Sequence, residues 1–526
     1  MVDILIKNAE LVDGSGQLRK TSDIAIQGDK IIDIGDLGEI SAKSVVDAKG
    51  KVVSPGFIDM HSHEDMLITV APEAESLVCQ GITTVVTGQC GMSPVPLMEE
   101  TREEAIKNLG MSDVPIPWEE LSSFGSFIDL MEKTGMSVNL HALVGQGAIR
   151  SAVMGYSADR PSEEQIEKMQ DLVRQAMEEG AAGITTGLIY PPGSYASTEE
   201  LIEITKPVGE KGGIYFSHLR GEGDTLLEAT REAIEIGRKT GSAVQHSHFK
   251  AAGRDNWGLA DKALNLIEKA RAEGMDVTAD MYPYTAGGTS LVAILPEWTQ
   301  EGGLDDIAKR LSDNETRLRI TDSMKTEGFF KVAEWDKVLI PDSENPEHVG
   351  KYISELAEKS GKTPYNWIYD AILETNGNIS MILFMMSEEN IKKQLVYPFM
   401  MIGTDGVGMP FEGPYAKGKP HPRNFGTYPR VLGKYVREEK AITLEDAIWK
   451  STGLPAKKLG FSDRGLIRPG YKADLVIFDP NTIIDKSEFI DPFQRPEGIE
   501  KVFVNGQIVV ENGLHTQVRS GVVTSR

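Results

Sequence analysis

The sequence predicts an α/β protein, a (β/α)8 TIM-like barrel with a small β-sandwich domain built from both termini and an inserted helical subdomain. Three observations lead to this prediction. Short apolar runs alternate with helical stretches through the middle of the chain, which is typical of a parallel sheet covered by helices. Both ends of the chain contain short strand-like runs, and one long break interrupts the middle series. At 526 residues the chain is long enough for one large barrel with accessory parts.

The two ends of the chain look alike. Residues 1–53 contain short alternating runs broken by glycines, which predicts antiparallel strands with tight turns. Residues 461–526 show the same pattern, and Asn505-Gly506 is a strong hairpin signal. Neither end has enough strands to close a sheet alone. We therefore predict that the two segments pair into one β-domain with adjacent chain ends.

Residues 54–460 are predicted to form the barrel. Its clearest helices are residues 162–179, which begin with Ser-Glu-Glu-Gln as a capping box does, and residues 225–240, which carry an apolar face. Eight apolar runs are predicted as parallel strands, enough to close a barrel. These runs are residues 57–61, 83–87, 137–144, 183–189, 213–217, 243–247, 276–281 and 399–403.

A long stretch separates the last two predicted strands. It contains charge-rich, helix-like segments at residues 304–325 and 349–359. A connection of this length is not a plain loop. We therefore predict an inserted helical subdomain at about residues 287–395, beside the face where the active site is expected.

Charge and composition narrow the classes of partner. The net charge is −24, from 55 Lys and Arg against 79 Asp and Glu, and no dense basic block occurs, so nucleic acid is not expected as a partner. No secretion signal is recognisable at the N-terminus, and the longest apolar run, near residues 379–386, is too short to span a bilayer. Only two cysteines occur, Cys79 and Cys90, which favours a reducing compartment and a cytoplasmic location. The oligomeric state stays open, a homo-oligomer included.

Candidate metal ligands stand at the ends of several predicted strands. His61 and His63 are alternate residues, which point to the same side of an extended strand. Further apolar runs end in Cys90, His218, His246 and His248, and Asp405. Because the chemistry of a (β/α)8 barrel lies at the C-terminal ends of its strands, these side chains are expected on one face. Thiolate, imidazole and carboxylate donors together predict a zinc-dependent hydrolase.

Each candidate has an ordinary structural explanation when it is taken alone. A buried Cys is usually a small hydrophobic residue, a single His is more often hydrogen-bonded than metal-bound, and Asp before Gly is commonly a turn residue. Cys79 lies in a helix-like segment without other candidate ligands, so we interpret it as structural. The joint occurrence of the others at strand ends favours a metal site.

Several segments also carry a family resemblance. Val53-Ser-Pro-Gly-Phe-Ile-Asp-Met-His-Ser-His and Gly465-Leu-Ile-Arg-Pro-Gly-Tyr-Lys-Ala-Asp-Leu-Val-Ile-Phe resemble the amidohydrolase superfamily. Gly88-Gln-Cys-Gly and Ser247-His-Phe-Lys are more selective and are similar to N-acyl-D-amino-acid deacylases, or D-aminoacylases. The resemblance covers essentially the whole chain.

The resemblance implies a set of metal ligands. Cys90, His218 and His248 would hold a tightly bound zinc ion, and His61 and His63 would form a weaker second position. Many binuclear relatives place a bridging lysine at the fourth strand, and this chain has none there. A thiolate can bridge two metals instead, so occupancy of the second position stays open.

His246 is a competing candidate. On an extended strand His246 shares a face with His248, as a rival ligand or as a neighbour of the ligands. The Ser-His-Phe-Lys context favours His248.

The implied reaction is hydrolysis of the amide bond of N-acyl-D-amino acids, with Asp405 as general base and acid. The substrate's α-carboxylate needs cationic partners, for which Lys250 and Arg423 are candidates. Lys250 would share the strand face of His248 if the extended conformation continues. The resemblance adds Tyr190, Tyr282 and Ser290 as substrate contacts. The sequence does not reveal the preferred side chain or acyl group, and the preference for D-residues rests on the resemblance.

Three alternatives stay open. A cyclic amide hydrolase, of the hydantoinase or dihydropyrimidinase kind, usually carries the fourth-strand lysine that this chain lacks. A deaminase usually carries a helix-borne Glu with a nearby His that we do not find here. A non-enzymatic scaffold on a decayed hydrolase barrel tends to lose metal ligands, whereas this chain retains all five and the aspartate.

Overall fold

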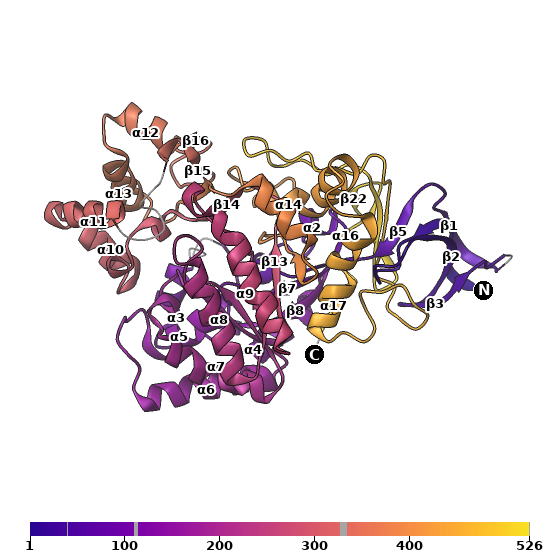
Figure 1. Ribbon diagram of the computed structural model, residues 1–526, viewed down its shortest axis with the longest axis horizontal. Coiled ribbons are helices and arrows are strands. Elements are labelled where there is room, and N and C mark those ends of the chain that lie inside the picture. Colours follow the sequence, from indigo (N-terminus) through magenta and orange to yellow (C-terminus); the bar gives the residue numbers. More distant parts are fainter. Residues whose placement is uncertain (39, 110–113, 327–333, 525–526) are drawn as a thin grey trace.

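The computed structural model describes residues 1–38, 40–109, 114–326 and 334–524. Within these residues eight parallel strands form a barrel, which confirms the predicted fold class (Figure 1). The strands are β6 (Phe57–Asp59), β7 (Ile82–Thr87), β8 (Asn139–Ala142) with its continuation β9 (Val144–Gly145), β10 (Gly183–Gly187), β11 (Ile214–His218), β12 (Ala243–His246), β13 (Val277–Met281) and β18 (Met400–Ile402). Nearly all of their residues are buried, as expected for parallel strands covered on the outside by helices.

The barrel closes between its first and last strands. Ser62, just after β6, forms a parallel bridge with Gly406, just after β18. The hydroxyl of Tyr428 donates across the same joint, 3.0 Å from the Ile58 carbonyl oxygen and 3.1 Å from that of Ile402. The C-terminal ends of β6 and β18 are therefore neighbours, although they are far apart in the sequence.

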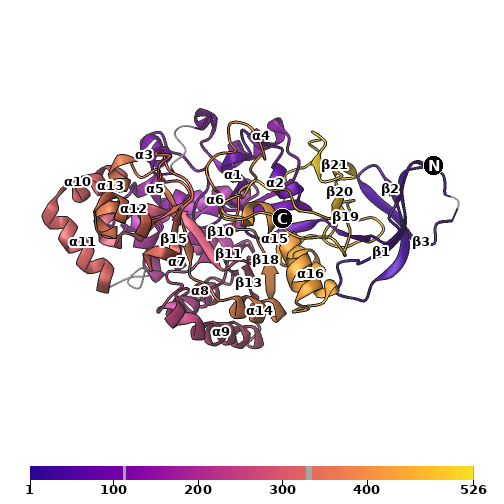
Figure 2. The ribbon, with the colours of Figure 1, turned by 90° about the horizontal axis from the view of Figure 1, so that it is seen from above.

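Helices surround the barrel (Figures 1 and 2). The predicted capping box begins α6: the Ser162 hydroxyl accepts from the Gln165 amide, and the Gln165 side chain accepts from the Ser162 amide. The longer helices are α4 (Phe124–Thr134), α5 (Gln146–Met154), α6 (Glu163–Glu178), α7 (Thr198–Glu210), α8 (Leu226–Thr240), α9 (Ala260–Ala272), α14 (Glu388–Val396), α15 (Arg423–Arg430), the π-helix Val431–Glu438, α16 (Leu444–Ser451) and α17 (Gly453–Leu459). Short helices are α1 (Glu64–Leu67), α2 (Glu75–Val78) and α3 (Arg102–Asn108).

Strands from both ends of the chain share one sheet. β5 pairs antiparallel with β19, so that Val53 lies opposite Ile477. The sheet encloses its own apolar core, which includes Ile24, Leu475 and Phe503. Its strands are β1 (Val2–Leu11), β2 (Lys20–Gln27), β3 (Lys30–Gly35), β4 (Ala42–Asp47), β5 (Val52–Pro55), β19 (Leu475–Phe478), β20 (Ile499–Val504), β21 (Gln507–Glu511) and β22 (Leu514–His515).

The expectation of adjacent chain ends is wrong. β1 begins at the outer side of the terminal sheet, whereas the last described residues return to the barrel (Figures 1 and 2). There Val523 forms a bridge with Leu140 of β8, and Gly521 forms one with Met136. Backbone hydrogen bonds to a barrel strand hold the C-terminal tail away from the N-terminus.

The segment after β13 carries a small sheet as well as helices. Its sheet consists of β14 (Ala286–Ser290), β15 (Val338–Ile340), β16 (Lys351–Tyr352) and β17 (Ser380–Phe384). The helices are α10 (Gly303–Ser312), α11 (Asn314–Thr326), α12 (Ile353–Ser360) and α13 (Pro364–Glu374). These elements share an apolar core separate from that of the barrel. They lie at the opposite end of the molecule from the terminal sheet, with the barrel between (Figures 1 and 2).

The helix that follows this segment belongs to the barrel. Ile391 and Leu395 of α14 are buried in the main apolar core, which the barrel strands share. Among the helices of the described residues, none combines the length and the apolar character that crossing a bilayer requires.

Candidate metal centre and active site

Three of the predicted ligands converge at the C-terminal end of the barrel. Cys90 follows β7, His218 ends β11, and His248 follows β12. The Cys90 Sγ atom lies 3.5 Å from His218 Nδ1 and 3.4 Å from His248 Nε2. The three ligand atoms all lie within 4.8 Å of one another, and the three side chains are buried. One sulfur with two imidazole nitrogens is a typical donor set for zinc.

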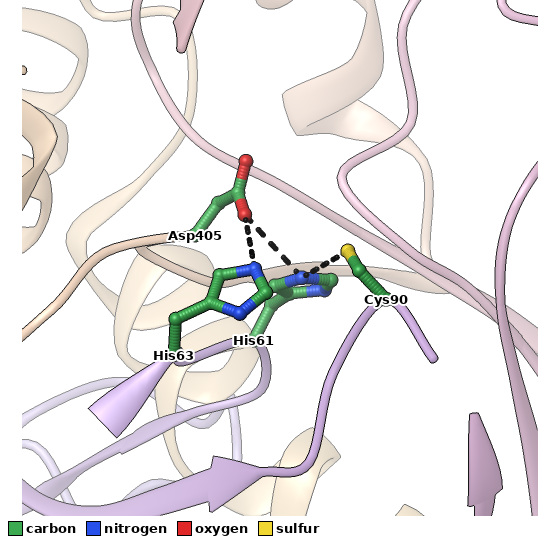
Figure 3. A group of neighbouring side chains, drawn as sticks. All are labelled: His61, His63, Cys90 and Asp405. Atoms are coloured by element: carbon green, nitrogen blue, oxygen red, sulfur yellow. Dashed lines mark hydrogen bonds and ion pairs between the residues drawn. The ribbon is translucent and has the colours of Figure 1, made fainter. Parts of the chain in front are cut away.

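A second group shares the same sulfur. His61, His63, Cys90 and Asp405 place their ligand atoms within 4.8 Å of one another. Figure 3 shows the four side chains grouped together. Asp405 Oδ1 lies 3.4 Å from His61 Nε2 and 3.2 Å from His63 Nε2. His61 Nε2 is also 3.4 Å from the Cys90 sulfur. The Cys90 sulfur therefore lies between two potential metal positions.

The backbone turns sharply at three of these residues. Cys90, His248 and Asp405 have positive φ angles of 55°, 34° and 51°, a region that residues with side chains rarely adopt. Such conformations persist where the surrounding structure imposes them, often at functional sites. Each turn comes directly after a strand and directs a side chain to the barrel mouth.

The turn at His248 separates it from His246. β12 ends at His246, so strand alternation does not extend to His248. Among the described residues His246 belongs to neither ligand group, and both of its buried ring nitrogens lack a hydrogen-bond partner. Of the two candidates, only His248 lies at the Cys90 sulfur.

The expected strand extension to Lys250 is also wrong. Residues 247–250 are not in a strand, because the chain turns after β12. Lys250 nevertheless reaches the site, since its Nζ atom lies 2.7 Å from His248 Nδ1.

The protonation states fit a bound cation. Burial lowers the pKa of His218 to about 3 and lowers that of His61 well below its ordinary value. Both imidazoles are therefore neutral and have a lone pair to offer. Burial also raises the pKa of the Cys90 thiol well above its ordinary value. A cation beside the sulfur would favour the thiolate, so the donors suit zinc both in type and in charge.

Asp405 is held ionised by its neighbours. Burial opposes ionisation, but the charge of Arg423 and a hydrogen bond from His63 outweigh it and hold the pKa of Asp405 well below its ordinary value. Arg423 Nη1 donates to Asp405 Oδ2 at 2.6 Å and Nη2 donates to the Gly288 carbonyl at 3.3 Å. The guanidinium carbon also lies 5.0 Å from the centre of the Tyr282 ring. Asp405 is therefore a buried carboxylate that is ionised.

Sequence reasoning missed Glu222. Its Oε1 atom lies 3.1 Å from His248 Nδ1 and accepts from Lys250 Nζ at 2.6 Å. Its Oε2 atom lies 3.9 Å from His218 Nε2. One carboxylate thus faces the outer nitrogens of both imidazoles whose inner nitrogens face Cys90. Its position four residues after His218, in the loop that follows β11, was the available signal.

Two further buried carboxylates were missed as well. Asp280 on β13 accepts from the His248 amide at 2.7 Å and lies 3.5 Å from His61 Nδ1. Asp59 at the end of β6 accepts from the Thr404 amide at 2.7 Å. Both carboxylates fix the backbone next to predicted ligands. Their signal was an Asp inside an apolar strand, which needs a partner when it is buried.

A cavity of about 1240 Å³ opens above these residues, between the barrel and the inserted segment. The predicted substrate contacts line it, namely Tyr190, Lys250, Tyr282, Ser290 and Arg423. So do the predicted site residues His63, Cys90, His218, His248 and Asp405, whereas His61 is buried beneath the surface of the cavity.

The predicted substrate contacts Tyr190, Ser290 and Arg423 differ in the hydrogen bonds that their side chains make. The Tyr190 hydroxyl bonds to Thr289 Oγ1 at 3.0 Å and so links the barrel to β14. Ser290 is exposed, and its hydroxyl caps a short helical turn by accepting from the Val292 amide at 3.3 Å. Arg423 Nε is buried without a hydrogen-bond partner, which leaves a donor for a ligand.

A barrel with clustered Cys, His and Asp side chains at its mouth defines a metal-dependent hydrolase. A family model described as the amidohydrolase family matches residues 44–208 and 401–510. A D-aminoacylase of Alcaligenes xylosoxydans xylosoxydans is 36% identical over 532 residues, which cover 100% of this chain and 98% of that protein. The chain belongs to the amidohydrolase family and, within it, to the N-acyl-D-amino-acid deacylases.

The chain is also similar to other deacylases and, more distantly, to a hydantoinase. The N-acyl-D-glutamate and N-acyl-D-aspartate deacylases of the same organism are each 35% identical, over 96% of this chain and 93% and 92% of those proteins. A solved N-acyl-D-glutamate deacylase from Bordetella bronchiseptica, with zinc and a phosphonate inhibitor, has a TM-score of 0.84 and 32% identity over 100% of both chains. An L-hydantoinase from Arthrobacter aurescens, at 18% identity and a TM-score of 0.59 over 100% of both chains, shares the fold alone.

Proposed function

We propose that this chain hydrolyses the amide bond of N-acyl-D-amino acids with zinc as cofactor, releasing a carboxylate and a free D-amino acid. The observation that carries the proposal is the convergence of Cys90, His218 and His248 beside the ionised Asp405. The full-length likeness to D-amino-acid deacylases supports the choice of substrate class.

The roles of the protein groups follow from their positions. When bound, zinc lowers the pKa of a coordinated water and polarises an acyl carbonyl. Asp405 accepts the proton of the attacking water and passes it to the amine nitrogen, which is a poor leaving group until it is protonated. Arg423 keeps Asp405 ionised and directs one of its oxygens toward His61 and His63.

The substrate's α-carboxylate needs donors beside these groups. Arg423 offers its unpartnered Nε, and Tyr282 lies between the two cations, 5.0 Å from Arg423 and 5.7 Å from Lys250. A guanidinium with a free donor is well suited to a carboxylate. We assign Tyr190 and Ser290 to the opposite wall of the cavity, as contacts for the rest of the substrate.

Two metal positions of unequal strength are part of the proposal. The tight position is formed by Cys90, His218 and His248, which are all buried. The second is formed by His61 and His63 with Asp405, and the His63 side chain is 22% exposed. β10 ends in Thr185-Thr186-Gly187 and offers no bridging lysine, so Cys90 is the donor that both positions share.

The alternatives have weaker support. A cyclic amide hydrolase is supported by the fold alone, because the L-hydantoinase is only 18% identical to this chain. A scaffold protein has no need for buried metal donors with neutral imidazoles and an ionised carboxylate beside them. The proposal includes an N-acyl amino acid as substrate and a cytoplasmic location, the latter supported by the free thiols of Cys79 and Cys90.

A substrate screen tests the proposed function. The zinc-loaded chain, the chelated chain and the variant Asp405→Asn are each incubated with N-acetyl-D-amino acids, their L-enantiomers and hydantoins, and free amine is measured. We expect amine release from the D-series alone, dependent on zinc. Asp405→Asn should retain zinc and lose roughly 10²- to 10⁴-fold in kcat, the usual contribution of a general base.

The screen also separates the alternatives. Ring opening of hydantoins without release from N-acetyl-D-amino acids would replace the proposal with the cyclic amide reaction. Failure to retain stoichiometric zinc would favour a scaffold. Full activity of Asp405→Asn would remove Asp405 from the mechanism.

A further inference from the structure

The three deacylase relatives differ in the charge of the D-residue that they are named for. Their identities to this chain are almost equal, so sequence likeness does not choose among D-aminoacylase, D-glutamate and D-aspartate activities. The choice has to come from the cavity. An acidic side chain brings a second carboxylate to the site, and that carboxylate needs a cation of its own.

The two cations nearest the metal donors are each paired with a carboxylate. Lys250 Nζ donates to Glu222 Oε1 at 2.6 Å, and Arg423 Nη1 donates to Asp405 Oδ2 at 2.6 Å. All four side chains are buried. Under the proposed function, Arg423 binds the α-carboxylate, which every substrate of this class carries.

A third cation of the cavity wall, Arg220, is paired with Glu232. Arg220 Nε donates to both oxygens of Glu232, at 3.2 Å and 3.0 Å. Its Nη1 and Nη2 atoms donate to the carbonyls of Ser194 and Ala196 at 2.9 Å and 2.8 Å, and Nη2 also donates to Glu232 Oε1 at 3.0 Å. These contacts hold the loop after β10 and use four of the five N–H groups of the guanidinium.

The remaining cations of the described wall, Lys107 and Lys417, are exposed lysines. Lys107 Nζ is 2.6 Å from Asp305 Oδ1. An exposed ammonium stabilises a carboxylate little, because both groups stay hydrated. A second substrate carboxylate would have to compete with one of the buried pairs or rely on such an exposed lysine.

Apolar side chains also line the wall. It includes side chains from the segment after β7, from the segment after β10 and from the inserted segment, namely Leu97, Leu188, Ile189, Val292, Ile294 and Leu295. Burying an apolar substituent against these side chains stabilises the complex. A carboxylate placed there loses its hydration and gains no hydrogen bond or ion pair to replace it.

From these contacts we infer that the enzyme accepts D-residues with uncharged side chains and discriminates against D-aspartate and D-glutamate. The inference rests on the proposed function and adds the substrate's side-chain class to it. It follows from the pairing of the buried cations Lys250 and Arg423 with carboxylates, together with the apolar side chains that line the wall.

Three substrates of matched length test the inference. kcat/KM is measured on the zinc-loaded full chain with N-acetyl-D-methionine, N-acetyl-D-glutamine and N-acetyl-D-glutamate. We expect the D-glutamate substrate to be ~100-fold poorer than the D-methionine substrate, because its side-chain carboxylate is desolvated without a partner. A ratio above about tenfold supports the inference and a smaller ratio overturns it.

The D-glutamine substrate separates charge from polarity, since it has the size of D-glutamate without its charge. We expect its kcat/KM to lie closer to that of D-methionine than to that of D-glutamate. If it is as poor as D-glutamate, the argument from paired cations fails. A preference for D-glutamate would overturn the inference and leave the proposed function intact, whereas no hydrolysis of any of the three would contradict the proposed function itself.

Discussion

At the scale of single residues, the side chains with metal-donor atoms could be predicted from the sequence. The carboxylates that contact those side chains could not. Cys90, His218 and His248 were chosen because each follows an apolar run, and the structure brings their donor atoms together. Strand alternation left His246 and His248 equivalent, because a positive φ at His248 is not visible in the sequence. Glu222 lies in a loop whose path depends on packing, so its position four residues after His218 did not reveal that it also faces His248.

Glu222 provides a test at this scale. Glu222→Gln keeps the shape of the side chain but removes the charge that faces the outer nitrogens of His218 and His248. We expect zinc affinity to fall roughly 10- to 100-fold, because such partners orient metal-bound imidazoles and raise their basicity. Competition with a chromophoric chelator measures the affinity directly, without reference to activity.

Glu200→Gln is the matched control. Glu200 is also a buried carboxylate in an ion pair, with Arg150 at 3.0 Å, but it contacts no predicted ligand. The Glu200→Gln variant should therefore have the zinc affinity of the wild type. Equal affinities in the Glu222 variant and the wild type would show that Glu222 does not support the ligands.

At the scale of elements, close backbone packing determines where the strand ends lie. Gly187 ends β10 beside the Cys90 segment, and a Cβ atom at this position would lie 2.0 Å from the Cys90 carbonyl oxygen. Only glycine permits this approach, so the fourth strand holds the loop that carries the thiol. The helices were predictable from their 3.6-residue period and caps, whereas the sheet of the inserted segment was not, because its strands are short and pair across large sequence separations.

Gly187→Ala should therefore displace Cys90. We expect lower zinc content and a loss of roughly 1–3 kcal/mol in the free energy of unfolding, since the backbone has to shift to accept the methyl group. Gly258→Ala is the control, because nothing lies within 4 Å of a Cβ atom there. Zinc titration and denaturant unfolding of both variants check the prediction, and wild-type zinc content in Gly187→Ala would contradict it.

At the scale of the whole molecule, a buried polar network joins the barrel to the terminal sheet. Asp474 accepts from Asn139 of β8 at 3.1 Å, from the Asn505 amide at 2.6 Å and from Arg464. The side chain of Arg464 is 5% exposed. If Asp474 were removed, the Arg464 guanidinium would lose this ion pair. The barrel and the terminal sheet would also lose the hydrogen bond between Asn139 and Asp474.

Asp474→Ala should destabilise the chain by about 3–5 kcal/mol, the usual cost of an unpaired buried charge. Asp171→Ala should cost less than about 1 kcal/mol, because the pair of Asp171 with Arg174 is largely exposed. Denaturant unfolding compares the two. Similar losses in the free energy of unfolding of both variants would show that the hydrogen bonds and ion pair of Asp474 do not stabilise the chain.

The sequence by itself determined the order of strands and helices, the residues with metal-binding donors and the positions where those donors follow a strand. These features are local, since periodicity and residue type are enough to recognise them. Only the tertiary structure decided that a turn after β12 brings His248 to Cys90, that Glu222 lies behind two imidazoles and that the buried cations Lys250 and Arg423 are paired with carboxylates. Those features depend on backbone turns and on contacts between distant segments, whose energies arise only when the barrel closes.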